Sequence, residues 1–319
     1  MAQELNVRVA RKHVEAVDIC SFELVSVEGS ALPAFAAGSH IDVGLSNGLT
    51  RQYSLCNDPT ESHRYVIGVL KDPSSRGGSR AMHEQVREGD VLRISAPKNH
   101  FPLRDGARRH LLLAGGIGVT PLLCMAERLA AAGEDFALHY CTRSRTRAAF
   151  VDRIGSAAFA SSVTFHFDDE PARKLDLDAL IGVPQAGVHL YVCGPRGFMD
   201  WVLGTARARG WPPEQLHFEY FGADVAKLES DGSFEVQFAR SGRVVVVTKD
   251  QTVLEALTQA GVDVPFSCEQ GVCGTCVTRV LAGEPEHRDM FLTPDEQAAN
   301  DRFAPCCSRS KSARLVLDL

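Results

Sequence analysis

Residues 267–276 read Ser-Cys-Glu-Gln-Gly-Val-Cys-Gly-Thr-Cys, and a further cysteine follows at position 306. This is the C-x4-C-x2-C…C spacing by which four thiolates hold a plant-type two-iron, two-sulfur cluster. Gly271 and Gly274 suit that interpretation, because glycines let the loop curl and bring its N–H groups close to the sulfurs. We therefore predict a one-electron carrier in the C-terminal third. Its expected cluster ligands are Cys268, Cys273, Cys276 and Cys306.

Two other uses of these cysteines are less consistent with the pattern. Zinc sites usually take C-x2-4-C pairs at both ends of the motif. Here the second half offers only the adjacent Cys306 and Cys307, which cannot easily both bind one tetrahedral ion. A disulfide framework is disfavoured because the chain is long and shows no signal-peptide pattern. The choice of Cys306 over Cys307 as fourth ligand stays open.

Composition and charge limit the class of protein. With 319 residues, 45% of them hydrophobic, the chain is long enough for two or three domains. The N-terminus lacks a basic region followed by an apolar core, and no apolar stretch approaches the ~18 residues that a membrane helix needs. We expect a cytoplasmic monomer with no membrane contact. The net charge of −6 argues against nucleic acid as a partner.

The pattern of predicted secondary structure changes twice along the chain. Up to about Gly106, short β-like runs alternate with Gly, Pro and Asn, which predicts a small antiparallel barrel. From His110, apolar runs alternate with helical stretches, which predicts a parallel sheet. The expected barrel strands include Asn6–Ala10, Phe22–Val27, Ile41–Leu45, Tyr65–Leu70 and Val91–Ser95. The expected helices of the second segment include Thr120–Ala132 and Gly197–Arg209.

A third segment follows a polar joint at residues 222–232. It opens with a predicted hairpin, Phe234–Phe238 and Val244–Val247, and a short helix over Val253–Gln259 leads into the cysteine loop. The predicted division is a barrel at 1–106, an α/β domain at 107–224, a linker at 225–231 and the iron–sulfur domain at 232–319.

The stretch Arg51-Gln-Tyr-Ser-Leu55 lies on a predicted barrel strand. Arg51, Tyr53 and Leu55 then share one face, and Ser54 points away. A flavin would use an aromatic edge for its ring, a hydroxyl near its reactive nitrogen and an arginine for its phosphate. Taken alone, the pentapeptide fits an ordinary polar barrel strand better.

A glycine-rich loop follows at residues 74–82 and opens a predicted short helix. Exposed N–H groups at a helix start bind phosphate, and glycines allow its close approach. A plain surface turn explains the loop equally well until Arg51 is considered with it. Together they predict a flavin phosphate cradle made of Arg51, Gly77, Gly78 and Ser79.

In the second segment, Gly115-Gly-Ile-Gly-Val-Thr-Pro121 runs from a strand directly into a helix. Such a junction presents the helix N-terminus to a pyrophosphate, and proline is tolerated in the first turn. The pattern is not the G-x-G-x-x-G fingerprint. No acidic residue ends the next strand, where Arg143, Arg145 and Arg147 stand instead. These arginines suit either the extra phosphate of NADP or the ordinary pyrophosphate and ribose.

The triplet Cys193-Gly194-Pro195 ends the apolar strand that begins at Val188. Ligands gather at the carboxyl ends of strands in open parallel sheets. A lone cysteine there is more often inert core packing. The glycine junction at 115–118 and the Gly-Pro that follows Cys193 favour a cofactor pocket.

Taken in order, these motifs resemble the phthalate dioxygenase reductase family, which includes vanillate O-demethylase reductases, over essentially the whole chain. The resemblance rests on Arg51-x-Tyr-Ser54, Gly115-Gly-x-Gly-x-Thr-Pro121, Cys193-Gly-Pro195, Phe218-Glu-Tyr-Phe221 and the cysteine loop. It implies an antiparallel β-barrel with FMN, an α/β domain for NADH and a C-terminal β-grasp ferredoxin domain. It also implies delivery of electrons to a separate Rieske-type terminal oxygenase in aromatic catabolism.

The resemblance also implies roles for single residues. Arg51 would hold the flavin phosphate, and Ser54, with Tyr53 and Leu55, would line the ring. Either Phe221 or Tyr220 would cover the flavin. The residues expected at the dinucleotide are Gly115, Gly116, Gly118, Thr120, Pro121, Arg143, Cys193 and Gly194, with Ser54, Cys193 and Phe221 closest to the chemistry. Arg143 departs from the acidic residue of a strict NADH enzyme, so NADPH stays possible.

The expected mechanism is hydride transfer from NADH to the flavin, followed by single-electron release through the cluster to the partner. A reductase for a cytochrome P450 or another haem oxygenase would carry the same motifs. A redox-sensing, metal-binding adaptor is an alternative from another class, and it would show no NADH turnover.

Overall fold

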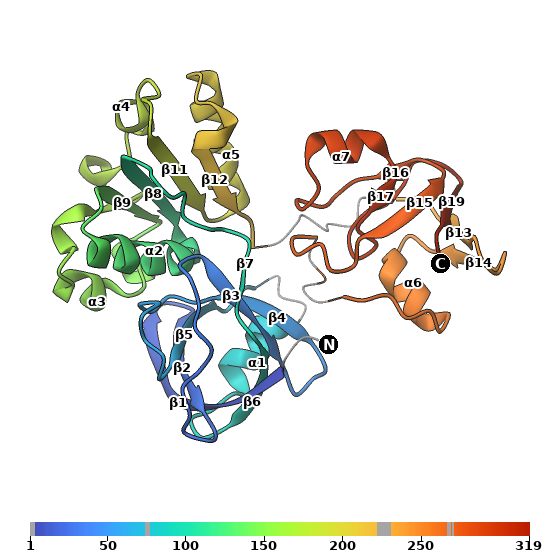
Figure 1. Ribbon diagram of the computed structural model, residues 1–319, viewed down its shortest axis with the longest axis horizontal. Coiled ribbons are helices and arrows are strands. Elements are labelled where there is room, and N and C mark those ends of the chain that lie inside the picture. Colours follow the sequence, from blue (N-terminus) through green and yellow to red (C-terminus); the bar gives the residue numbers. More distant parts are fainter. Residues whose placement is uncertain (1–3, 74–76, 222–230, 267–268, 270) are drawn as a thin grey trace. The chain divides into compact units, whose positions relative to one another are not determined.

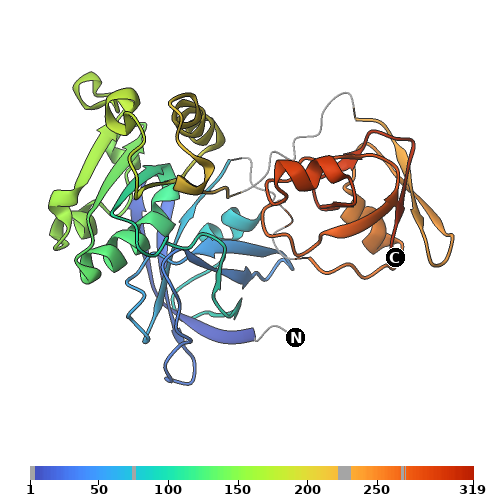
Figure 2. The same cartoon turned by 45° about the horizontal axis from the view of Figure 1, so that its top comes forward.

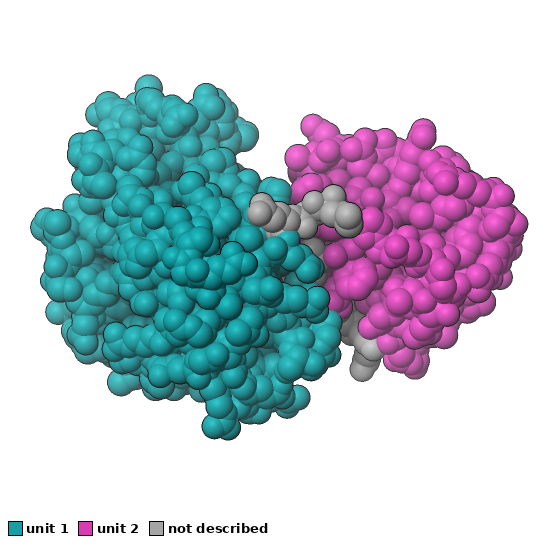
Figure 3. Space-filling view, turned by 60° about the horizontal axis from the view of Figure 1, so that its bottom comes forward, with its two compact units in different colours: residues 1–219 teal, residues 220–319 magenta. Residues whose placement is uncertain are grey.

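The structure is a computed structural model, and it describes residues 4–73, 77–221, 231–266, 269 and 271–319. The chain divides into two compact units, Met1–Glu219 and Tyr220–Leu319, coloured teal and magenta in Figure 3. The predicted barrel and α/β domains both belong to the first unit. Their boundary near residue 106 stays a prediction, and most of the predicted linker at 225–231 lies outside the described residues.

The first unit begins with an antiparallel barrel (Figure 1). Its strands follow the order β4-β3-β6-β1-β2-β5, with β7 beside β3. A bridge between Leu55, just after β4, and Ile67 within β5 closes the sheet. The strands are β1 (Glu4–Ala16), β2 (Ile19–Ser26), β3 (Ser39–Gly44), β4 (Thr50–Ser54), β5 (Tyr65–Leu70), β6 (Val91–Ser95) and β7 (Lys98–Asn99).

Alternation of side chains builds the barrel core. Val7 and Val9 on β1 and Ile41 and Val43 on β3 are fully buried, and the residues between them face the other way. The strand β1 is longer than predicted, and two register shifts against β2 bend it around the barrel. Helix α1 (Gly78–Glu84) adds its apolar side chains to the same core.

A five-stranded parallel sheet forms the rest of the first unit, in the order β10-β9-β8-β11-β12. All four neighbouring pairs are parallel, as the alternation of strands and helices predicts. The strands are β8 (Arg109–Gly115), β9 (Phe136–Thr142), β10 (Val163–Phe167), β11 (Val188–Cys193) and β12 (Leu216–Glu219). The helices are α2 (Val119–Ala132), α3 (Val151–Ser156), α4 (Leu177–Ile181) and α5 (Arg196–Ala208), with 3-10 turns at Gly116–Gly118, Arg145–Arg147, Ala160–Ser162, Pro171–Arg173 and Pro213–Gln215.

The barrel packs closely against the start of α2. A Cβ atom added at Gly68 of β5 would lie 2.8 Å from Thr120 Cγ2 and 3.0 Å from the Phe150 ring. Only glycine therefore allows these two layers to approach so closely. A backbone hydrogen bond of 3.0 Å from Val17 N to Thr146 O adds a second contact.

The second unit is a mixed sheet in the order β14-β13-β19-β15-β17, with helix α6 packed beside it (Figures 1 and 2). The predicted hairpin forms as β13 and β14 around Gly242, whose φ is 69°. This arrangement is the expected β-grasp fold. Its elements are β13 (Phe234–Phe238), β14 (Val244–Val247), α6 (Val253–Gln259), β15 (Thr278–Ala282), β16 (Pro285–Glu286), α7 (Pro294–Ala299), β17 (Arg302–Phe303), β18 (Arg309–Ser310) and β19 (Arg314–Leu317).

Helix α6 begins at a capping box. The Thr252 side chain accepts from the backbone N–H of Glu255, and the Glu255 carboxylate accepts from the backbone N–H of Thr252. Two donors that the helix itself leaves unpaired are thereby satisfied. The cap fixes the helix that packs Leu254 and Leu257 into the core shared with Cys276 and Cys306.

Within the described ranges, no helix is both long enough and apolar enough to cross a membrane.

Thr252→Ala should lower the free energy of unfolding of the second unit by about 1 kcal/mol, because the first turn of α6 loses its cap. Denaturant unfolding followed by circular dichroism would measure the change. Thr252→Ser keeps the hydroxyl acceptor and is the matched control. Equal stability of Thr252→Ala and the parent protein would contradict the role given to this cap.

Candidate cofactor sites

Arg51 lies on β4 and is almost completely buried. Its side chain lies directly against α1, since a Cβ atom at Gly78 would be 2.6 Å from Arg51 Cγ and 2.7 Å from Nε. Gly77, just before the helix, has a φ of 101°, which side chains other than glycine's avoid. The structure thus brings together the arginine and the glycine-rich helix start of the predicted phosphate cradle. Residues 74–76 of that loop lie outside the described part.

Tyr53 offers an unsatisfied polar group beside this cradle. Its hydroxyl is buried and has no hydrogen-bond partner among the described residues, and burial raises its pKa. A buried hydroxyl without a partner is uncommon in a protein interior. A bound ligand with an acceptor atom would satisfy it, so Tyr53 fits the proposed flavin. Leu55, in contrast, is fully buried and closes the barrel through its bridge to Ile67.

The glycine junction after β8 lies against the end of β11. A Cβ atom at Gly118 would be 2.2 Å from the Cys193 carbonyl oxygen, and one at Gly194 would be 2.9 Å from Gly115 Cα. Gly116 has a φ of 53°. The two strand ends therefore meet with bare backbone at the carboxyl edge of the sheet, where a dinucleotide is expected.

Two residues of this junction face inward. The Thr120 hydroxyl donates to the Ile117 carbonyl at 3.0 Å, and its methyl group lies against Gly68 of the barrel. Pro121 is buried in the first turn of α2. In the structure both residues serve the start of the helix and its packing.

Arg143, expected at the dinucleotide, is exposed just beyond the end of β9. Its neighbour Arg145 places its guanidinium 5.0 Å from the centre of the Phe167 ring, a cation–π contact. Arg143 is thus the better placed of the two to reach a phosphate.

Glu219 is a site residue to which the sequence analysis assigned no role. It ends β12, where it is the registered neighbour of Cys193 on β11. The Ser54 hydroxyl donates to its Oε2 at 3.2 Å, so barrel and parallel sheet meet at this carboxylate. Burial raises the pKa of Glu219 to about 7, and the Ser54 hydrogen bond only partly opposes that shift. An acid at the carboxyl end of a parallel strand was the signal that could have identified it.

Cys193 is fully buried, and burial, followed by the charge of Glu219, raises the pKa of its thiol well above the usual value. The thiol therefore stays protonated at neutral pH. Ser54, Glu219 and Cys193 come from three strands and converge on one place. Phe221 and Tyr220 belong to the second unit and are half-buried, so the choice between them stays a prediction.

The cysteine loop brings sulfur atoms together in the second unit. Cys276 and Cys306, each at most 3% exposed, hydrogen-bond to one another, and the backbone N–H of Gly271 points at the Cys306 sulfur. The hydrogen bond with Cys306, burial and the charge of Cys273 all raise the pKa of Cys276. Cys307 also hydrogen-bonds to Cys306, and its thiol donates to the Ala304 carbonyl at 3.7 Å.

These residues fit a thiolate-bound cluster. Burial and neighbouring sulfur atoms oppose ionisation of these thiols. Iron would offset that effect by binding the thiolates. Cys268 and Gln270 lie outside the described residues. Among the residues that are described, no three His, Cys, Asp or Glu side chains are arranged to hold a metal ion.

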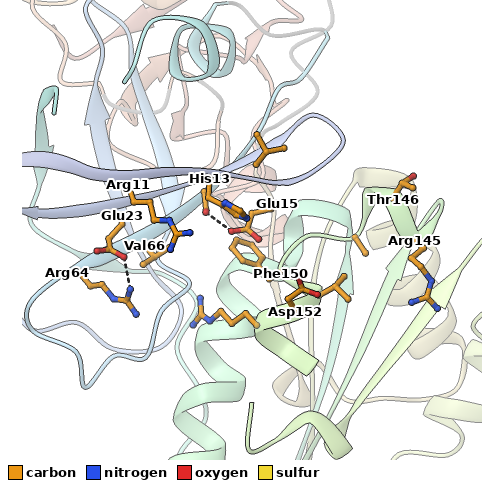
Figure 4. Close-up of a pocket in the computed structure, with 15 residues that line it drawn as sticks. Arg11, His13, Glu15, Glu23, Arg64, Val66, Arg145, Thr146, Phe150 and Asp152 are labelled. Carbon is orange, nitrogen blue, oxygen red and sulfur yellow. Dashed lines mark hydrogen bonds and ion pairs between the residues drawn. The ribbon is translucent and has the colours of Figure 1, made fainter. Parts of the chain in front are cut away.

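A separate hollow of about 670 Å³ lies between β1 and β2 of the barrel and the segment 145–153 (Figure 4). Within its lining Arg64 pairs with Glu23 at 2.6 Å, and the Ser21 hydroxyl donates to Glu15 at 2.6 Å. Of the residues considered for cofactor binding in the sequence analysis, Arg145 lines it, whereas Arg51, Ser54, Arg143 and Cys193 do not.

Comparison with known proteins decides the family. Residues 236–311 match the 2Fe-2S iron-sulfur cluster binding domain, and residues 95–216 match the N-terminal domain described as dimethylamine monooxygenase subunit DmmA-like. The vanillate O-demethylase oxidoreductase of Pseudomonas putida is 59% identical over 98% of this chain and 98% of its own. The phthalate dioxygenase reductase of Burkholderia cepacia is 42% identical over 99% of this chain and 97% of its own.

The chain belongs to the phthalate dioxygenase reductase family. A solved phthalate dioxygenase reductase, described as a modular structure for electron transfer from pyridine nucleotides to [2Fe-2S], superimposes with a TM-score of 0.82. It is 42% identical, over 99% of this chain and 98% of its own. Membership confirms the predicted fold class, the electron-transfer oxidoreductase activity and the iron–sulfur domain. The adaptor alternative is left without support.

The same architecture also occurs in a larger protein. An intact type IV self-sufficient cytochrome P450 monooxygenase matches 99% of this chain with 41% of its own length, at 40% identity and a TM-score of 0.81. This family of reductase modules therefore stands both as separate chains and fused to a haem domain.

Arg51→Ala should weaken flavin retention by about 1.5–3 kcal/mol, because a charge-assisted phosphate contact is lost. Dialysis followed by fluorescence titration with FMN would measure the affinity. Arg51→Lys is the matched control, since it keeps the charge but not the fork. Unchanged affinity of the alanine variant would show that Arg51 does not bind the phosphate.

Glu219→Gln should stabilise the protein progressively more as the pH rises. Folding raises the pKa of the Glu219 carboxyl. The stability that its protonated form contributes is therefore fully present below about pH 4.5 and is lost as the pH rises through about 7. Calorimetric Tm values at pH 5.5, 7 and 8.5 would show the variant gaining on the parent. The exposed Glu214→Gln is the control. A constant difference across this range would refute the shift.

Proposed function

We propose that this chain is the NADH-dependent reductase component of a Rieske-type oxygenase that removes methyl groups from aromatic acids such as vanillate. The observation that carries this proposal is end-to-end identity with reductases of one activity. Besides the 59% relative, a vanillate O-demethylase oxidoreductase from Acinetobacter baylyi is 47% identical over 99% of each chain. Family membership implies an oxygenase partner, and these names supply its reaction.

The first unit would hold FMN and the nicotinamide. Arg51 and the backbone at Gly77 and Gly78 would bind the FMN phosphate, and Tyr53 would donate its unpartnered hydroxyl to the same ligand. When bound, FMN accepts a hydride and gives up single electrons. The residues of the first unit would position the flavin and nicotinamide rings and exclude water. The hydrogen-bonded pair Ser54 and Glu219 would hold a proton where the barrel meets the parallel sheet.

The dinucleotide would lie on the bare backbone at the carboxyl edge of the parallel sheet. Gly118 and Gly194 let the two strand ends meet with bare backbone at this edge, and the exposed Arg143 supplies a positive charge for the pyrophosphate. Cys193 would lie near the nicotinamide as a neutral, compact side chain. NADH is the proposed electron donor. Because Arg143 could also contact the extra phosphate of NADPH, NADPH would serve as a poorer donor.

The second unit would hold the [2Fe–2S] cluster through Cys268, Cys273, Cys276 and Cys306. Cys306 is proposed over Cys307 because its sulfur contacts Cys276 and accepts a hydrogen bond from the Gly271 N–H. The Cys307 thiol donates a hydrogen bond to the Ala304 carbonyl. We further propose that the protein works as a cytoplasmic monomer, since its electron donor is a cytoplasmic metabolite and its partner is a separate protein.

A haem oxygenase is a second candidate partner, favoured by the match to the self-sufficient cytochrome P450. Purified candidate oxygenases mixed with this reductase and NADH would decide. Vanillate-dependent NADH consumption with the Rieske enzyme supports the proposal, and consumption only with a cytochrome P450 contradicts it.

Cys273→Ser should abolish NADH-dependent reduction of cytochrome c while bleaching of the flavin by NADH stays fast. The reason is that electrons reach one-electron acceptors through the cluster, and serine does not replace a thiolate ligand well. Anaerobic stopped-flow absorbance and EPR would measure both steps. Cys307→Ala is the matched control and should keep the cluster. Equal loss of both activities in Cys273→Ser would contradict this order of transfer.

A further inference from the structure

His40 on β3 is a buried histidine whose ring nitrogens have no hydrogen-bond partner among the described residues. This holds for both Nδ1 and Nε2, and the residue is 5% exposed. Nearly all buried polar side chains are hydrogen-bonded, and each exception calls for an explanation. A polar ring kept in this state at a cost in stability indicates a role beyond packing.

The position of His40 links it to Ser54. In the antiparallel pair β3–β4, His40 is directly opposite Ser54, and Asp42 is directly opposite Gln52. Residues that face one another in such a pair project from the same side of the sheet. The Gln52–Asp42 hydrogen bond of 2.9 Å shows that the side chains on this side do meet. Ser54 therefore has Glu219 bonded to its hydroxyl and His40 beside it.

A second histidine leads from His40 to the surface. The ring of His100 lies 5.4 Å from that of His40, centre to centre, and the two planes are tilted by 33°. His100 is exposed. A buried and an exposed imidazole thus follow one another from the side of Ser54 towards the surface.

The charged groups around His40 keep its ring neutral. Burial lowers its pKa to about 4; the carboxylate of Asp42 opposes this shift, while His100 and Lys98 add to it. Asp42 is itself engaged, because Lys98 Nζ donates to its Oδ2 at 2.6 Å. A neutral imidazole can take a proton at one ring nitrogen while it releases a proton from the other, so it can relay protons without staying charged.

The proposed function requires such a relay. Each hydride from NADH brings two electrons and one proton, whereas the cluster carries electrons alone. The balance is NADH plus two oxidised clusters giving NAD⁺, two reduced clusters and one proton, which must leave the flavin site. We propose that the Ser54 hydroxyl turns from Glu219 towards His40, takes up this proton from the flavin site as it gives its own to His40, and that the proton then leaves through His100 to solvent. The inference rests on the proposed flavin site at Ser54.

His40→Gln in the holoprotein tests the relay. Anaerobic stopped-flow mixing with NADH in weak buffer, with a pH-indicator dye, would follow flavin bleaching, cluster reduction and proton release separately. We expect normal bleaching, with proton release and cluster reduction slowed at least about tenfold. The solvent deuterium isotope effect on the slowed step should increase. In His40→Ala, free imidazole should restore much of the rate, which a purely structural role would not allow.

His100→Gln is the second variant, because its exposed side chain can be changed without disturbing the core. It should also slow proton release, and the exposed His63→Gln, on the same barrel, should not. Proton release at the parental rate in folded His40→Gln overturns the proposal. Should His40→Gln not fold, parental release in His100→Gln overturns it. Slowing in Glu219→Gln but in neither histidine variant assigns the exit to Glu219 instead. Absence of NADH-dependent bleaching in the parent protein would refute the proposed function itself.

Discussion

Ser54 donates a hydrogen bond to Glu219 across 165 residues of sequence, and this contact joins the end of a barrel strand to the end of a strand in the parallel sheet. Two sheets with unrelated topologies thereby present one composite site. Gly68 allows the closeness, since any side chain there would collide with Thr120 and Phe150. Burial at this junction raises the pKa of the carboxylate to about 7.

The second unit meets a different physical constraint, because it must hold negatively charged sulfur atoms in an apolar environment that excludes water. Cys276 and Cys306 belong to the same apolar core as Leu257 and Phe303. Positive φ angles at Gly271 and Gly274 let the loop turn, and the N–H of Gly271 faces a sulfur. Without metal, these thiols resist ionisation; with it, the same burial shields the cluster from water. The cysteine loop thus belongs to a unit with its own core.

Much of the fold could be predicted from local pattern. Apolar runs bounded by Gly, Pro and Asn identified five barrel strands, and the hairpin and α6 formed at the predicted residues. Site residues were harder to interpret. Thr120 and Pro121 carry a dinucleotide-like pattern, and in the structure they also start and pack α2, so their part in binding a dinucleotide stays a prediction. Leu55 closes the barrel. Glu219 and His40 gave little signal, because their importance depends on partners that are distant in sequence.

The sequence by itself determined the order of the three modules, the class of cofactor that each can take and the spacing of the cysteines, because these depend on short-range geometry along one strand or loop. Only the tertiary structure decided which polar groups are buried together. The raised pKa of Glu219, its hydrogen bond with Ser54 and the unpartnered ring of His40 all follow from the packing of β3, β4 and β12. Burial is a property of the assembled sheets, so no stretch of sequence reveals it alone.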